Sequence, residues 1–372
     1  MTAKISNFQI ASLFVMTRMF SDCMNFPSMV TKYGMQRYTV IVLSYLVVFI
    51  FFIPVMILSR KFEGESIFSI FYTRCKPLFF VVSVPFSIIL IYGATLTSTR
   101  LEFFITNTLM NTMTCFVAIL LFTSSAVYGV TKGISSMMRI APLILIIFTG
   151  SIIISAVILF KELKFEYLYP AFIDTPSTFW LELQQEIAKN GELLIFLVFC
   201  RHIDKKAHRG ILLYVPFVLF MTLFARTFCM VILGPGMDVA NFPYNRVAAM
   251  VNFVVVERID GLDMFNWIVA AILKIVMFMT AIKEIINFAV KERAAKIVTT
   301  VLTIISGLVC WYFSVNHHLL MIWDFSQLAL PVFCLFLVVC PIIAIIMERK
   351  KQNYEQQKNK KENASGLPDA SS

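Results

Sequence analysis

Charged residues are scarce in this chain: Asp, Glu, Lys and Arg make up 15% of its 372 residues, whereas hydrophobic residues make up 59%. A soluble globular protein carries about 25% charged residues and about 45–50% apolar ones. A single water-soluble domain cannot cover so much apolar surface with polar residues, so the excess must face lipid. Soluble enzymes, secreted disulfide scaffolds, disordered chains and nucleic-acid-binding proteins therefore fit poorly, and the composition indicates a protein embedded in a lipid bilayer.

Motifs that carry enzyme or metal chemistry are also missing. The sequence contains no H-E-x-x-H, no phosphate-binding glycine loop, no G-x-S-x-G, and no C-x-x-C among its eight cysteines. Six of those cysteines lie within apolar runs, which favours small packing residues over a disulfide framework. The histidines lie in two expected loops and are interpreted as solvated; they are His202, His208, His317 and His318. We therefore expect no enzyme activity, no metal and no cofactor.

Long apolar runs are abundant, and a helix needs about 20 such residues to cross a bilayer. The apolar start of the chain also resembles a signal peptide, but no small-x-small cleavage site follows it. Residues 348–372 are polar and predict a disordered tail after a transmembrane domain over 1–347. Ten stretches are expected to span, namely 8–30, 38–59, 77–98, 111–130, 140–160, 178–200, 211–233, 262–290, 294–313 and 322–347.

The distribution of Lys and Arg predicts the orientation of these spans. With the N-terminus inside, the inside segments hold 20 basic residues and the outside segments hold 7. Cytoplasmic loops of membrane proteins carry an excess of Lys and Arg. The asymmetry therefore favours an even number of crossings with both termini in the cytoplasm.

The first and sixth spans differ from the others because polar residues interrupt them, near 21–27 and near 190–192. Broken helices at matching places in two halves are a pointer to the substrate site of inverted-repeat transporters. The repeats here would cover about 8–160 and 178–347. Two other interpretations stay open: a proline-kinked first helix, or an amphipathic outer helix over 178–189 followed by a short sixth span starting near Gly191.

Further polar residues lie within other spans. Lys274 is surrounded by aliphatic residues, so it must pair or face water; it either takes the place of a coupling cation or pairs with a carboxylate such as Asp22. A purely structural ion pair is also compatible, and for Arg226 snorkelling to the membrane surface is a further interpretation. Small and hydroxyl residues near the end of the third span serve helix packing or line a ligand; they include Tyr92, Thr95 and Thr97.

One stretch carries a family resemblance, FPYNRVAAMVNFVVVERIDGLDMFNWIVAAILKIVMFMTAI over 242–282. It is similar to the F-P pair, the E-R-x-D-x-L element (Glu257, Arg258 and Asp260) and the following lysine-bearing span of GerA-type spore germinant receptor B subunits. These belong to the endospore germination permease family of the amino acid–polyamine–organocation superfamily. RLEFF at 100–104 and NGELLIFLVF at 190–199 support the resemblance, which covers about 4–347.

The resemblance implies an all-α polytopic membrane protein with ten transmembrane helices in a LeuT-like 5+5 inverted repeat, with helices 1 and 6 discontinuous. It also implies a nutrient-sensing subunit of the spore inner membrane, acting beside an A subunit and a lipoprotein C subunit. A small germinant such as an amino acid would bind at the helix breaks. The ligand-binding residues expected from the pattern and the resemblance together are Ser21, Asp22, Cys23, Tyr92, Thr97, Asn190, Gly191, Glu192 and Lys274.

The chain departs from the family because it has no glycine in its first 33 residues, where many relatives have glycines in the first break. Asp22 would also repel a ligand carboxylate unless Lys274 or Arg18 compensates its charge. Two other functions therefore stay open. They are a proton-coupled secondary transporter of amino acids or amines, and a scaffold subunit whose binding site has decayed.

Overall fold

The computed structural model describes residues 5–23, 36–62, 64–109, 114–168, 176–203, 208–237, 240–251, 260–316 and 325–350, together with Gln357. Helices make up most of this part of the chain. In order they are α1 (Asn7–Cys23), α2 (Gln36–Lys61), α3 (Ile67–Arg74), α4 (Lys76–Phe104), α5 (Cys115–Lys132), α6 (Ile134–Ile158), α7 (Pro176–Ala188), α8 (Phe196–Phe199), α9 (His208–Leu233), α10 (Pro243–Ala249), α11 (Asp260–Ala289), α12 (Glu292–Val315) and α14 (Ala329–Phe333).

Eight helical segments are long and apolar enough to cross a membrane, and they correspond to the eight uninterrupted spans expected from the sequence. Lipid offers no hydrogen-bond partners, so a crossing segment must satisfy its backbone groups within a helix. The segments are Arg37–Lys61, Lys76–Thr108, Cys115–Lys132, Ile134–Glu162, Arg209–Leu233, Gly261–Ala289, Glu292–Val315 and Ala329–Lys350.

The two remaining expected spans are the two with polar interruptions. The first is represented by α1, which has 17 described residues and ends at Cys23. The sixth is divided into α7 and the four-residue α8, with a turn and a 3₁₀ segment between them. The structure therefore distinguishes the same two segments that the sequence does.

Two short helices were not predicted because each is too short to produce a long apolar run. In α3, the hydroxyl of Ser66 caps the helix by accepting from the backbone N–H of Ser69 at 3.1 Å. In α10, Pro243 occupies the first turn, where its missing N–H costs nothing. Both helices lie beside membrane-spanning ones, α3 against α4 and α10 against α9 and α11.

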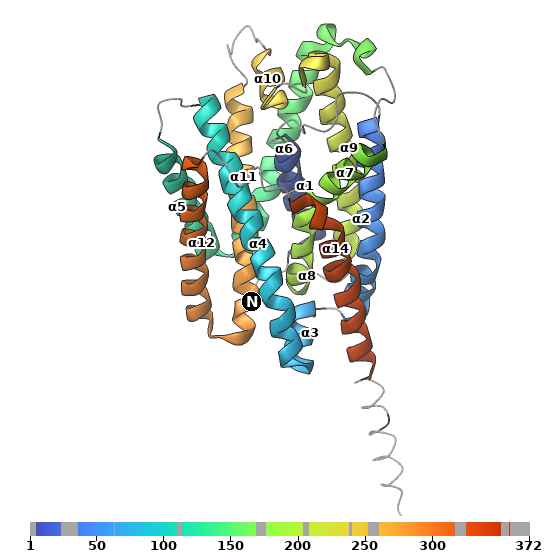
Figure 1. The fold of residues 1–372 in the computed structure, drawn as a ribbon, viewed down its shortest axis with the longest axis vertical. Helices are drawn as coiled ribbons and strands as arrows, with labels where there is room; N and C mark the ends of the chain where they lie inside the picture. The colour runs from blue at the N-terminus through green and yellow to red at the C-terminus, as the bar shows by residue number, and fades with distance from the viewer. Residues whose placement is uncertain are drawn as a thin grey trace, which may run out of the picture.

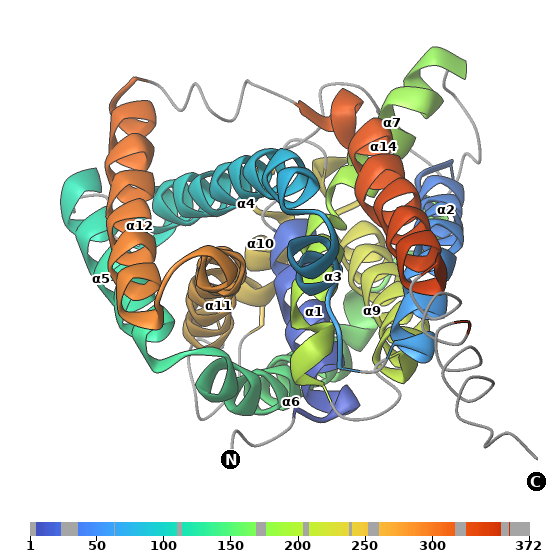
Figure 2. The same ribbon diagram turned by 90° about the horizontal axis from the view of Figure 1, so that it is seen from below.

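The long helices form two groups that lie side by side (Figure 1). In one group α4, α5, α11 and α12 pack against one another, and in the other α1 and α2 pack against α9, with α7 against α2. Viewed along the helices, α11 lies inside a ring formed by α4, α12, α5 and α6 (Figure 2). Accordingly, 78% of the most apolar window of α11 is buried, against 28–39% in the other seven segments. Residues on α11 are therefore positioned to contact much of the bundle interior.

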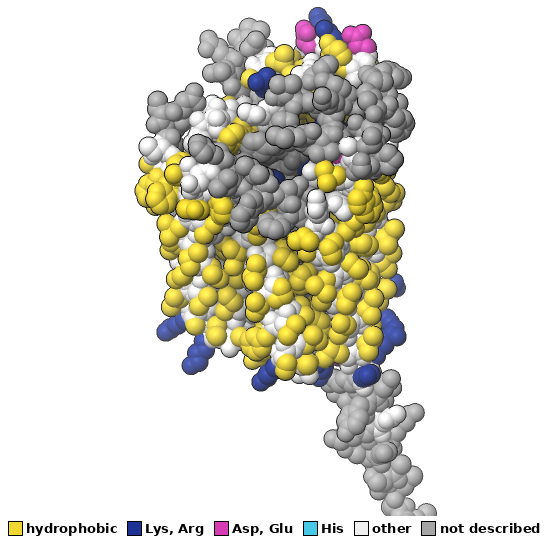
Figure 3. All heavy atoms as spheres, in the orientation of Figure 1, with side chains coloured by type: hydrophobic (Ala, Val, Ile, Leu, Met, Phe, Trp, Pro, Cys, Tyr) yellow, Lys and Arg dark blue, Asp and Glu magenta, His cyan; other side chains and the backbone are white. Residues whose placement is uncertain are grey.

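The outer surface is suited to lipid. Hydrophobic side chains form a broad belt on the face drawn in Figure 3, and Lys and Arg gather below the belt, at the end where α3 lies in Figure 1. Large apolar side chains such as Ile88, Ile146 and Val157 are 60–71% exposed on this surface. Basic residues at one end of an apolar belt are typical of the cytoplasmic side of membrane proteins.

The last described helix continues to Lys350, three residues into the stretch expected to be a tail. Arg74 holds that end with two contacts to Glu348, at 2.8 Å and 3.2 Å. Beyond residue 350, Gln357 alone lies within the described residues.

Candidate functional site

The winding changes at the predicted place in the sixth span. The α-helix α7 ends at Ala188, Lys189 and Asn190 form a turn, and Gly191–Ile195 continue as a 3₁₀ helix into α8. The side chain of Asn190 donates to the carbonyl of Glu186 at 3.0 Å, which satisfies one of the backbone acceptors freed at the end of α7. The break therefore brings polar side chains and backbone groups into the bundle interior, where Asn190 and Glu192 are buried.

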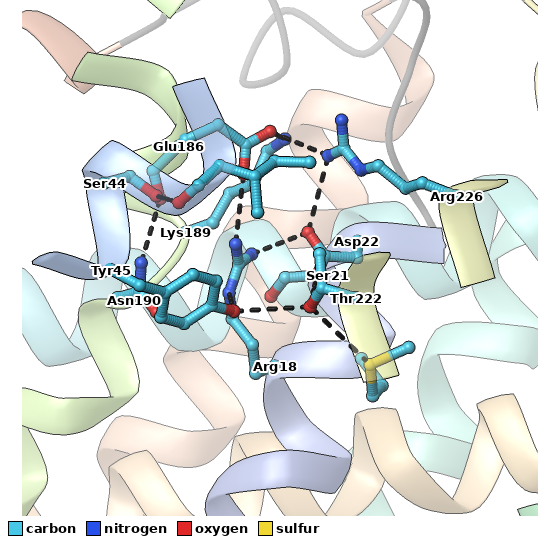
Figure 4. Close-up of polar contacts among 12 residues, drawn as sticks. Arg18, Ser21, Asp22, Ser44, Tyr45, Glu186, Lys189, Asn190, Thr222 and Arg226 are labelled. Atoms are coloured by element: carbon cyan, nitrogen blue, oxygen red, sulfur yellow. Dashed lines mark hydrogen bonds and ion pairs between the residues drawn. The ribbon is translucent and has the colours of Figure 1, made fainter. Parts of the chain in front are cut away.

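Ionic contacts surround the guanidinium of Arg18, which is fully buried in α1. Its Nη1 lies 2.8 Å from Asp22 Oδ1, and its Nη2 lies 3.1 Å from Glu186 Oε2 of α7. Its Nε donates to the hydroxyl of Tyr45 in α2 at 3.0 Å. Thr222 of α9 donates to Asp22 Oδ2 at 2.9 Å (Figure 4). These contacts connect α1 with α2, α7 and α9.

Glu186 receives contacts from three cationic side chains. Besides Arg18, Arg226 of α9 lies 2.7 Å from Glu186 Oε1, and Lys189 Nζ lies 2.5 Å from the same oxygen (Figure 4). Arg226 also lies 3.6 Å from Asp22 Oδ1. Burial of so many charges is tolerated only because each is paired, since an isolated ion in this environment would cost several kcal/mol.

Lys274 of α11 makes a separate set of contacts with α1 and with the 3₁₀ segment. Its Nζ donates to the carbonyl of Thr17 at 3.2 Å and to Glu192 Oε2 at 3.2 Å, and it contacts the hydroxyl of Ser21. Glu192 and Lys274 are 1% and 6% exposed, so this is a buried ion pair. We call the four cations and three anions of these contacts the buried charge cluster: Arg18, Asp22, Glu186, Lys189, Glu192, Arg226 and Lys274.

The structure brings most of the predicted residues into one region, but one ion pair is formed by different residues than expected. Lys274 pairs with Glu192, and Asp22 pairs with Arg18 and Arg226, so the pairing of Lys274 with Asp22 was wrong. The reason is the helical phase of α1. Ser21 lies on the face turned toward α11, whereas Asp22, one residue later, is turned by about 100° toward α9.

Other predicted residues are placed differently. The hydroxyl of Thr97 donates to the carbonyl of Gly93 at 2.7 Å, within α4, and Thr95 meets Ser306 of α12 at 2.8 Å, so these hydroxyls serve helix packing. Tyr92 is half-buried on the same helix. Glu257 and Arg258, together with the side chains of Cys23 and Asp260, lie outside the described residues.

The break expected near 21–27 stays a prediction: Ser21 to Cys23 are α-helical, and 24–27 lie outside the described residues. Two further expectations are corrected. Arg226 turns inward to Glu186 rather than snorkelling, because two buried carboxylates attract it. His202 is not freely solvated: its Nε2 lies 3.0 Å from Glu284 of α11, which also lies 3.6 Å from Arg201.

Sequence reasoning missed the parts of the cluster contributed by single polar residues in otherwise apolar helices. Tyr45 and Thr222 are ordinary residues for membrane helices, and nothing in their neighbourhoods signals their contacts with Arg18 and Asp22. A signal did exist for Arg18 and Asp22, because residues four apart on a helix lie on the same face. Glu186 and Lys189 show the same signal three residues apart, at the end of α7.

The site joins carboxylates, guanidinium groups, ammonium groups and hydroxyls in a buried region, and such groups can contact a charged or polar solute. Within the described ranges, no group of three or more His, Cys, Asp and Glu side chains is placed to hold a metal ion. Intramembrane ionisable residues are in general functional.

Solved structures with a similar fold are membrane transporters. A substrate-bound, outward-open Na⁺-coupled sialic acid symporter matches with a TM-score of 0.63 and 12% identity, over 88% of this chain and 77% of the symporter chain. The nucleobase-cation-symport-1 family transporter Mhp1, closed with bromovinylhydantoin bound, matches with a TM-score of 0.61 and 12% identity, over 93% and 78% of the two chains. The chain therefore has a LeuT-like transporter fold. No curated protein sequence matches it.

The family comparison agrees with the resemblance found in the sequence. The family model of spore germination proteins, the spore permeases, matches residues 4–318, which includes every member of the buried charge cluster. The family and the similar structures are permeases and transporters rather than enzymes. The chain is an integral membrane protein and belongs to the family of spore germination proteins.

Proposed function

We propose that this chain is the nutrient-sensing subunit of a spore germinant receptor. It would bind a small polar germinant such as an amino acid and pass the signal to an A subunit and a lipoprotein C subunit, so that germination starts. The observation that carries the proposal is the buried charge cluster, which joins α1, α7, α9 and α11 beside the break between α7 and α8, because intramembrane ionisable residues are in general functional.

The proposed fold has ten crossings arranged as two five-helix repeats. Eight long segments account for eight of them, and α1 and the α7–α8 segment would be the discontinuous first and sixth helices. The similar transporter structures support this arrangement. We place the protein in a spore inner membrane, with both termini on the cytoplasmic side. The Lys and Arg side chains gathered at one end of the molecule in Figure 3 agree with this orientation.

The proposed ligand site lies where α1, the 3₁₀ segment and α11 meet. Asp22 does not count against an amino acid ligand, because Arg18 at 2.8 Å compensates its charge. Cys23, Tyr92 and Thr97 enter the proposal from the sequence pattern alone. The contacts within the bundle support a central role for Ser21, Asp22, Asn190, Gly191, Glu192 and Lys274.

Signalling requires that the ligand bind two conformations with different affinity, since a ligand that binds both equally shifts no equilibrium. The two conformations would differ in how the two helix groups pack against each other, with α6 in contact with both α1 and α11. A ligand at the break would contact both groups, because Glu192 follows α7 and Lys274 belongs to α11.

Germination dose–response curves test the receptor. Spores would carry Asp22→Ala, Glu192→Ala or Lys274→Ala, with Glu292→Ala as a control, since Glu292 pairs with Lys296 on the surface and is far from the cluster in sequence. We expect each site variant to shift the dose–response curve, Asp22→Ala and Glu192→Ala toward higher germinant concentrations, at equal protein levels in immunoblots, and the control to match the wild type. If all three site variants respond like the wild type, the chain is a scaffold subunit.

A proton-coupled secondary transporter of amino acids or amines is the second candidate. Both similar structures are cation-coupled transporters, and the ammonium of Lys274 lies among oxygens of α1 that would suit a cation. Uptake of radiolabelled amino acids by the isolated chain in proteoliposomes, with and without an imposed proton gradient, separates the candidates. Gradient-dependent uptake would favour the transporter, and binding without uptake would favour the receptor.

A further inference from the structure

We infer that Glu192 recognises the cationic amino group of the ligand, and that Lys274 occupies the same carboxylate from its other side. The inference rests on the proposed function, because it assigns a chemical class, primary amines including free amino acids, to the pocket proposed above. The inference also predicts that Glu192 and Lys274 have opposite effects on ligand affinity. It can therefore be tested separately from the general proposal that the chain binds a germinant.

The first argument is the occupancy of the carboxylate oxygens. Asp22 Oδ1 lies near Arg18 and Arg226, and Asp22 Oδ2 accepts from Thr222. Both oxygens of Glu186 contact cationic nitrogens at 2.5–3.1 Å. Two of the six carboxylate oxygens in the buried charge cluster have no hydrogen-bond partner among the described residues, Asp22 Oδ1 and Glu192 Oε1, and Asp22 Oδ1 has Arg18 at 2.8 Å. The contact of Glu192 with Lys274 is made by its other oxygen, Oε2, at 3.2 Å.

The second argument is the burial of that oxygen. Glu192 is 1% exposed, and the next three residues of its 3₁₀ segment, Leu193 to Ile195, are buried and apolar. A buried carboxylate oxygen without a donor is costly, so it marks a place for a donor, supplied by water or by a ligand group. An ammonium group supplies both the hydrogen bond and the compensating charge.

Lys274 explains why the carboxylate is stable before the ligand binds. Its three ammonium protons match three acceptors, the carbonyl of Thr17, the hydroxyl of Ser21 and Glu192 Oε2. A ligand ammonium at Oε1 would share the carboxylate with Lys274, so the two cations repel each other. The attraction between Lys274 and Glu192, which ties α11 to the α7–α8 segment, then becomes weaker as the ligand binds.

These positions predict opposite changes in two variants. Glu192→Gln removes the charge that attracts the ligand and should weaken the binding of amino acids by about 10- to 100-fold, the range for a hydrogen bond to a charged group. Lys274→Met removes the competing cation and should strengthen binding. The double variant E192Q/K274M leaves no unpaired charge at either position, so it remains a folded test if Glu192→Gln alone destabilises the chain.

The experiment measures thermal stabilisation of the full-length protein in lipid nanodiscs by added solutes, since a bound ligand raises the unfolding midpoint in a concentration-dependent way. The solutes are the common L-amino acids, their N-acetyl derivatives, the amines that lack the carboxylate, and glucose and uridine as uncharged solutes. The control variant is Glu102→Gln, a buried carboxylate on α4 that contacts Thr106 of its own helix. We expect it to bind like the wild type.

The outcomes separate the inference from the proposed function. Stabilisation by an amino acid but not by its N-acetyl derivative, weakened in Glu192→Gln and E192Q/K274M and strengthened in Lys274→Met, supports the inference. Equal binding of an amino acid by the wild type and both variants overturns the inference and leaves the receptor proposal intact, as does stabilisation by uncharged or N-acetylated solutes alone. Absence of stabilisation by every solute counts against both.

Discussion

Glu186→Gln removes one charge from the most heavily paired residue of the buried charge cluster, and we expect it to destabilise the protein strongly. Glu186 lies 2.5 Å, 2.7 Å and 3.1 Å from cationic nitrogens of three side chains, and it is 5% exposed. Glutamine has nearly the same shape, so the substitution leaves packing nearly unchanged, removes the charge and replaces one acceptor oxygen by an NH2 donor. With four cations and two anions left, the cluster acquires an additional uncompensated positive charge.

The magnitude follows from the cost of leaving a buried charge without its partner, about 3–5 kcal/mol in proteins. Arg18 and Arg226 retain Asp22 as a partner, at 2.8 Å and 3.6 Å, which keeps the loss within that range rather than above it. Lys189 has Glu186 as its ion-pair partner and loses most. We therefore expect the free energy of unfolding to fall by about 3–5 kcal/mol.

Reversible unfolding of the protein in detergent micelles measures this change, with a thiol-reactive fluorophore as the reporter. Cys75, Cys115 and Cys334 are replaced by Ser because they are partly or fully exposed, and Cys200, Cys229, Cys310 and Cys340, which are free and buried, become accessible on unfolding. Glu292→Gln is the control, because its ion pair with Lys296 lies on the surface, where the two side chains are 71% and 44% exposed. We expect the control to match the wild type, because exposed ion pairs contribute little to stability. Equal stability of Glu186→Gln and the wild type would refute the reasoning.

The remaining predictions use the same unfolding measurement. Gly307→Ala places a Cβ 2.6 Å from Thr123 Oγ1 between α12 and α5, so we expect a loss of about 1–3 kcal/mol that Thr123→Ala reverses; an unchanged midpoint would contradict this packing. Asn266→Leu replaces a fully buried amide that has no hydrogen-bond partner among the described residues, so stability should stay equal or rise, and a clear fall would mean that the amide is paired. Arg74 and Glu348 form a partly exposed pair, and a double-mutant cycle with alanine should give a coupling energy below about 1 kcal/mol, whereas a coupling of several kcal/mol would be inconsistent with its exposure.

Long apolar runs predicted eight membrane-spanning segments because a helix in lipid needs no other information than length and hydrophobicity. The same criterion identified the two exceptional spans by their polar residues. It failed for α3 and α10, which have eight and seven residues and depend on local signals, the cap at Ser66 and the proline at 243. Such signals indicate where a helix begins and say little about whether a short helix forms.

For the site, the residue types could be predicted and their pairing could not. On α1, Thr17 and Ser21 share one face and Arg18 and Asp22 share the next, as spacing by four predicts. The sequence does not say which neighbouring helix each face meets. The first face meets Lys274 of α11, and the second face meets α2, α7 and α9. Asp22 therefore points away from Lys274, which pairs with Glu192 instead.

This division of α1 suggests how the two helix groups are connected. The second face is held by ion pairs and hydrogen bonds within α1, α2, α7 and α9, so these helices should move together. Two contacts connect α11 to the chain around α8. Lys274 pairs with Glu192 before α8, and Glu284 pairs with His202 after it.

Ten residues separate the two contacts on α11, which is about 15 Å along a helix. Ten residues also separate Glu192 from His202. The stretch of chain between these two residues is therefore attached to α11 at both of its ends. A ligand that weakens the contact at Glu192 leaves the contact at His202 in place. The chain near Glu192 can then move away from α11 while the chain near His202 stays fixed. A complete separation of the two helix groups also requires the Glu284–His202 contact and the contacts of Lys274 with Thr17 and Ser21 to break.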